Sequence, residues 1–161
     1  MSRPVYLIIF HSPIFAAHWA LWVPQLREGK CEDTGKIISV QGSPSEGFVH
    51  EFERNYDLSK ETRSHVLKLL CDIPSTLVAE ATSEHCIDNA PIDELERSAC
   101  KIQAPSPSLR SSTSVSLSCP ILTRIKIQNC QTWLHEWVSS MVDDEVFPKH
   151  ALTVLDQAPK N

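Results

Sequence analysis

The chain has 161 residues, of which 42% are hydrophobic and 22% are charged, and its formal net charge is −5. This length suits one domain with an ordinary hydrophobic core, so the composition excludes a disordered chain, a collagen-like repeat and a coiled coil. The basic residues are scattered, and no apolar stretch approaches the ~20 residues of a membrane helix. We therefore expect residues 1–161 to form a single domain without a nucleic-acid partner or an integral membrane segment.

Short apolar runs in the first half of the chain predict strands. The runs over residues 4–10 and 16–23 are rich in β-branched and aromatic residues, and their short connection suits a hairpin. His11 and Pro13 interrupt this apolar region, which argues against a secretory signal and favours a cytoplasmic protein. Further strands are expected over residues 36–41, 48–52, 65–73 and 76–81, although the run over 65–73 is also compatible with a helix.

A change of pattern follows in the middle of the chain. Residues 91–101 predict a short helix, because proline is tolerated in a first turn and acidic residues lie near its start. Residues 105–119 contain seven serines and two prolines, which indicates a flexible loop. Residues 121–127 are one more candidate strand.

The clearest pattern begins at Cys130. Apolar residues follow it at the i, i+3, i+4 spacing through Val142, which predicts an amphipathic helix with a wide buried face. Asn129 is well placed as the N-cap, and Pro148 precedes a final short helix over residues 149–157. The candidate strands and these helices predict an α+β fold, with an antiparallel sheet of about five or six strands.

The six cysteines are dispersed without a close pair, so we expect free thiols, no metal and no cofactor. Cys130 differs from the others because it lies in the first turn of a helix. Cysteines in that position have pKa values of about 3.5–7.5, since the helix N-terminus favours the thiolate. The alternative is that Cys130 is a small core residue, as buried free cysteines commonly are.

A candidate base lies on the second predicted strand. His18 is the one ionisable residue of its run, with Ala20 and Trp22 on its face and Ala17 and Trp19 on the other. A thiolate paired with an imidazolium is the usual form of an activated cysteine nucleophile. The alternative for His18 is a core histidine with satisfied hydrogen bonds.

The segments 18–23 (HWALWV) and 129–134 (NCQTWL) resemble the two signature segments of the lecithin retinol acyltransferase group, a circularly permuted branch of the NlpC-type, papain-like superfamily. In that group a histidine begins an N-terminal strand, and the nucleophilic cysteine begins a C-terminal helix after an asparagine. The whole chain also resembles a family of small fungal proteins, through residues 47–56, 129–133 and 158–161.

The resemblance implies that Cys130 is the nucleophile, that His18 is the general base, and that a polar residue on the neighbouring strand orients the imidazole. Relatives often carry histidine at that third position, and this chain has Ser39 and Gln41 instead. His50 is a further candidate, or a surface histidine beside an acidic residue.

Two tryptophans complete the expected site. Trp22 shares the face of His18, and Trp133 lies one turn from Cys130, so both could line a pocket for an apolar substrate, although core packing is their ordinary role.

The resemblance predicts a permuted papain-like arrangement, in which an antiparallel sheet packs against a C-terminal nucleophile helix. The expected function is a cysteine hydrolase or acyltransferase that acts on an amide, ester or thioester through Cys130 and His18. One alternative is a cofactor-free cyclase or isomerase of fungal secondary metabolism that uses the same pocket. The other is a binding domain that kept the fold and lost catalysis. The expected partner is a small-molecule or acyl substrate of apolar character.

Overall fold

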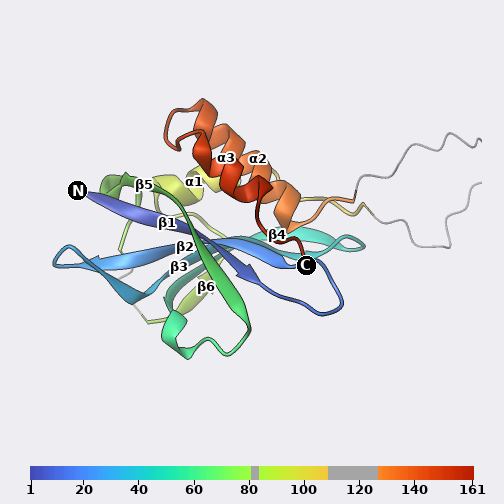
Figure 1. The fold of residues 1–161 in the computed structure, drawn as a ribbon, viewed down its shortest axis with the longest axis horizontal. Helices are drawn as coiled ribbons and strands as arrows, with labels where there is room; N and C mark the ends of the chain where they lie inside the picture. The colour runs from blue at the N-terminus through green and yellow to red at the C-terminus, as the bar shows by residue number, and fades with distance from the viewer. Residues whose placement is uncertain (81–83, 109–126) are drawn as a thin grey trace, which may run out of the picture.

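The computed structural model describes residues 1–80, 84–108 and 127–161. Within these residues, six strands form one antiparallel sheet in the order β5-β1-β2-β3-β4-β6, and three α-helices lie on one face of it (Figure 1). The strands are β1 (Ser2–Phe10), β2 (His18–Arg27), β3 (Lys30–Ser43), β4 (Gly47–Asp57), β5 (His65–Pro74) and β6 (Cys86–Asp88). The helices are α1 (Glu94–Cys100), α2 (Cys130–Asp143) and α3 (His150–Asp156). The α+β prediction is confirmed.

The first four strands pair with their neighbours in the sequence. β1 and β2 form the expected hairpin, with Phe10 opposite His18, and β2, β3 and β4 continue the meander. β5 then returns to the far edge, where it pairs with β1. β6 pairs with residues 52–54 of β4, so among the described residues the N-terminal part of β4 has no strand partner on its outer side.

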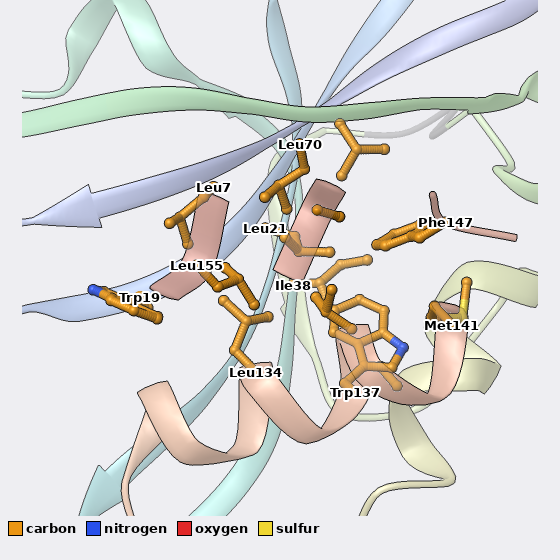
Figure 2. Packing of buried hydrophobic residues seen from close by; sticks show 14 of the residues in the cluster. Leu7, Trp19, Leu21, Ile38, Leu70, Leu134, Trp137, Met141, Phe147 and Leu155 are labelled. Atoms are coloured by element: carbon orange, nitrogen blue, oxygen red, sulfur yellow. The ribbon is translucent and has the colours of Figure 1, made fainter. Parts of the chain in front are cut away.

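The helices cover one face of the sheet and form the main core with it. Figure 2 shows Leu134 and Trp137 of α2 packed toward Leu21 and Ile38 of the sheet. All four side chains are fully buried. α2 begins where the sequence predicts, because the Asn129 side chain accepts hydrogen bonds from two backbone N–H groups of the first turn and forms a capping box.

The opposite face carries a smaller apolar cluster. It is formed by Ile8, Phe10, Ala20, Trp22 and Ile37. The connection between β4 and β5 contributes to its cover, since the Arg63 guanidinium lies 4.1 Å from the centre of the Phe10 ring and Leu58 packs against the cluster. Strand residues therefore alternate between a face under the helices and a second face with its own core.

Some elements differ from the sequence prediction. The strand expected over 76–81 is wrong for its described residues: Ser75–Leu77 forms a 3₁₀ turn closed by the Val78 N–H bond to the Ser75 carbonyl, and residues 78–80 are not in a strand. The ambiguous run over 65–73 is a strand, β5. β6 was not predicted, because three residues, two of them exposed, carry too little pattern. Most of the loop over 105–119 and the candidate strand over 121–127 fall outside the described residues.

No helix among the residues that the structure describes is long and apolar enough to cross a membrane.

Candidate functional site

Cys130 begins α2 and points into the core between the helix and the sheet. Its side chain is 6% exposed, and the thiol donates to the carbonyl oxygen of Ala17 over 3.9 Å. Burial raises the pKa of the Cys130 thiol above its ordinary value, although the backbone N–H groups of Trp19 and Gln131 favour the thiolate. The expected lowering of this pKa by the helix N-terminus is therefore wrong, because desolvation outweighs the helix end.

The C-terminal residues lie next to the start of α2 and form hydrogen bonds around Cys130. Gln131 Nε2 donates to the carbonyl oxygens of Ala17 (2.8 Å) and Lys160 (3.0 Å). The backbone N–H of Ala17 donates to the Lys160 carbonyl, and the Trp19 indole donates to the Pro159 carbonyl, both over 3.0 Å. These bonds tie the C-terminus to the start of β2 and α2.

His18 lies on the second face, beside both polar residues expected near it. Its ring stacks on Phe10, with centroids 6.0 Å apart, and its Nε2 lies 3.2 Å from Gln41 Nε2. The same amide nitrogen donates to the buried Ser39 hydroxyl over 3.4 Å. Burial, and secondarily the charge of Arg63, lower the pKa of His18 to about 4, so its imidazole is neutral at pH 7.

The structure does not bring Cys130 and His18 together. Ala17 and Trp19 belong to the core under the helices with Cys130, whereas His18 stacks on Phe10 of the second face. Side chains alternate along a strand, so a histidine between two residues that face α2 must point away from it. The expected dyad is not assembled, and the described structure offers the thiol no imidazole partner.

The two tryptophans expected to line a pocket are packed in different cores. Trp22 is buried on the second face, edge-on to Tyr56 with centroids 6.0 Å apart. Trp133 is buried under α2, and its indole N–H donates to the Ile102 carbonyl over 3.1 Å. They do not line one common site.

A different site lies along the N-terminal part of β4. An open groove with a volume of about 520 Å³ runs between this strand and two loop segments, which is within the ~300–1,000 Å³ of small-molecule sites. We call it the His50 groove. Its lining consists of Phe48, Val49, His50, Asn89, Ala90, Gln103 and Ala104. These residues combine apolar surface, two amides and one imidazole, and none carries a fixed charge.

The first loop segment of the groove is held by Arg54. The guanidinium donates to the Ala90 carbonyl over 2.7 Å and to the Asp88 carboxylate over 3.2 Å. The same carboxylate accepts from the backbone N–H groups of Asn89 (2.7 Å) and Ala90 (3.2 Å). These four hydrogen bonds fix the backbone of the turn over residues 88–90.

Arg54 is in turn fixed by a buried ion network. It donates to Glu96 over 3.1 and 2.8 Å, and Lys36 donates to the same carboxylate over 2.8 Å and to Asp93 as well. Glu96 is completely buried; burial raises its pKa, but the hydrogen bonds from Arg54 and Lys36 leave that pKa below its ordinary value. The network joins β3, β4 and α1, and the bond from Arg54 to the Ala90 carbonyl connects the first loop segment of the groove to it.

The second loop segment is held by backbone acceptors. His50 Nε2 donates to the Ile102 carbonyl over 2.8 Å, and the Trp133 indole donates to that same oxygen. The His50 ring lies edge-on to Trp133, with centroids 5.8 Å apart, and the Phe48 N–H donates to the Pro105 carbonyl over 2.8 Å. The imidazole is thus fixed in orientation by a hydrogen bond and a ring contact.

His50 was only a secondary candidate in the sequence, although its spacing from two phenylalanines indicates a buried strand face. Phe48, His50 and Phe52 share one strand face by period two, and Phe52 is fully buried, so His50 belongs to the face under the helices. Asn89 and Gln103 carry no local signal, because long-range contacts place their loops beside β4.

Within the described ranges, no group of three or more His, Cys, Asp or Glu side chains could hold a metal ion.

Comparison with known proteins gives one match. The model of a family of unknown function, DUF6540, matches residues 5–148, which is most of the chain. Neither the curated proteins nor the solved structures contain a match. The function has to be inferred from the geometry of the site.

Proposed function

The chain belongs to the DUF6540 family, and from its geometry we propose that it is a binding domain, which takes an uncharged, largely apolar small molecule into the His50 groove. The observation that carries this proposal is that both loop segments of the groove are fixed by hydrogen bonds within the protein. A site whose parts are already ordered loses little conformational entropy when a ligand binds.

The lining defines the chemistry of the ligand. Phe48, Ala90 and Ala104 offer apolar contact to the body of a small molecule. The amides of Asn89 and Gln103 can donate to and accept from its polar groups. A charged ligand would find no opposite fixed charge among the residues of the groove, so an uncharged molecule with a few hydrogen-bonding groups fits best.

Thiol acyl transfer in a permuted papain-like arrangement stays a prediction from the resemblance. A cysteine at the start of α2, packed against the strand that carries His18, supports it. However, the thiol faces the core under the helices and the imidazole faces the other side of the sheet. The same separation weakens a cyclase or isomerase that would use both groups, and we therefore favour binding.

The proposal is tested by titrating the protein with uncharged bicyclic aromatic alcohols and following backbone amide resonances. We expect shifts to concentrate at the residues that line the His50 groove. Ala90→Trp should fill the groove from an exposed position and weaken binding at least tenfold, whereas Ala16→Trp, at an exposed alanine of the β1–β2 connection, should leave it unchanged.

Two results would overturn the proposal. One is the absence of groove shifts with every alcohol of the panel at concentrations up to their solubility. The other is equal affinity of the two tryptophan variants. Cys130→Ser should bind as tightly as the wild type, because the thiol lies outside the groove.

A further inference from the structure

We infer that His50 makes the groove selective for ligands with a hydroxyl or N–H donor, which its Nδ1 atom accepts. This inference rests on the proposed function and adds to it the chemical feature by which a ligand is selected. The observation behind it is the hydrogen bond between His50 and the backbone carbonyl of Ile102.

That hydrogen bond determines which ring nitrogen carries the proton. A carbonyl oxygen can only accept, so the Nε2 atom that lies 2.8 Å from Ile102 must be the donor. A neutral imidazole has one N–H, and its other nitrogen is then an acceptor. The bond therefore makes Nδ1 the acceptor nitrogen of His50, and no side chain in the described parts of the chain donates to it.

The ring is also prevented from exchanging the roles of its nitrogens. The Ile102 carbonyl accepts from both His50 and the Trp133 indole, and the edge-on contact with Trp133 fixes the plane of the imidazole. A flipped ring or the other tautomer would lose the hydrogen bond from His50 and leave the carbonyl with the Trp133 indole as its donor, so the observed arrangement is favoured by the free energy of one hydrogen bond.

The other polar groups of the groove do not impose the same selection. Asn89 and Gln103 each present an amide oxygen and an amide nitrogen, so they can serve a ligand acceptor or a ligand donor. His50 alone among the lining side chains offers only an acceptor when it is neutral. A ligand that lacks a donor leaves this acceptor without a partner, and it should bind more weakly than its donor-bearing analogue.

The test compares 2-naphthol with 2-methoxynaphthalene, which differ by one methyl group on the oxygen. The titrations are done at pH 7.5. One hydrogen bond is worth about three- to tenfold in affinity, and we expect the alcohol to bind more tightly by that factor. In His50→Phe, which keeps a ring but has no acceptor, the two compounds should bind equally.

A second readout does not depend on a variant. Long-range proton–nitrogen spectra separate the protonated nitrogen of an imidazole from the bare one. We expect a protonated Nε2 and a bare Nδ1 for His50, and a change in the Nδ1 resonance on addition of 2-naphthol that 2-methoxynaphthalene does not produce.

The outcomes separate this inference from the proposed function. If both compounds bind in the groove with equal affinity to the wild type, or if Nδ1 carries the proton, the inference is wrong and the binding function stands. If neither compound shifts the groove resonances, the proposed function and the inference fail together. A tenfold preference that persists in His50→Phe would assign the selection to another residue and would also overturn the inference.

Discussion

Replacing Arg54 with methionine tests how much the buried ion network contributes to the free energy of unfolding. The substitution keeps a long apolar side chain but removes the two bonds to Glu96 and the bond to the Ala90 carbonyl. Glu96 is completely buried and keeps only Lys36 as a cationic partner, which Asp93 shares. Breaking a buried ion pair in this way costs about 3–5 kcal/mol. That is a large fraction of the ~5–15 kcal/mol that stabilises a typical domain.

The measurement is urea unfolding followed by tryptophan fluorescence, because all four tryptophans are buried. The free energy of unfolding comes from linear extrapolation to zero urea. The control is Arg97→Met. Arg97 pairs with Glu94 on the exposed side of α1, the helix that carries Glu96, and such exposed pairs contribute about 0–1 kcal/mol. A loss in Arg54→Met no larger than in Arg97→Met would refute the reasoning.

Three further predictions follow from particular residues. Iodoacetamide should modify Cys130 more slowly than the exposed Cys31 at pH 7, because burial raises the pKa of Cys130; peptide mass spectrometry checks this, and preferential labelling of Cys130 would contradict it. Stability should fall as the pH is lowered from about 6.5 toward 4, because His18 binds its proton near pH 6.5 when unfolded and only near pH 4 when folded. His18→Gln should remove that part of the loss in urea titrations at pH 7 and pH 4.5, and an unchanged pH dependence would argue against it. Gly35→Ala should destabilise the fold by about 1–3 kcal/mol, since the added Cβ would overlap the backbone carbonyl oxygen of Val23 and lie 2.7 Å from the Trp22 ring, and a thermal melt identical to the wild type would contradict that expectation.

Local patterns in the sequence were sufficient to predict several elements. The apolar spacing after Cys130 gave the position of α2, and Asn129 gave its first residue, because periodicity and capping depend on neighbours along the chain. The family resemblance implied that Ser39 or Gln41, on the strand next to His18, lies near the imidazole, and Gln41 Nε2 lies 3.2 Å from His18 Nε2.

The expected catalytic dyad failed for a reason that local patterns do not reveal. Alternation along β2 separates His18 from Trp19, but it does not say which of the two faces the helix layer covers. That depends on how α2 packs, and the helix packs on the face of Trp19 with Cys130 pointing into that core. The alternation along β2 was predicted correctly, but the dyad also required α2 to pack on the face of the sheet that carries His18.

The groove was out of reach of sequence reasoning for a related reason. Its loop segments come from residues near 90 and 103, and they meet β4 only because Arg54 and the Ile102 carbonyl form long-range hydrogen bonds. Nothing in the local sequence distinguishes Arg54 from a surface charge, although it is buried and paired with Glu96. Buried charges of this kind become visible only when the partner strands and helices are in place.

A crystal structure of the protein with 2-naphthol tests ligand binding in the His50 groove most directly. We expect the aromatic rings to lie against Phe48, with the hydroxyl group within hydrogen-bond distance of His50 Nδ1. A ligand bound beside Cys130, or against His18 on the other face of the sheet, would contradict it.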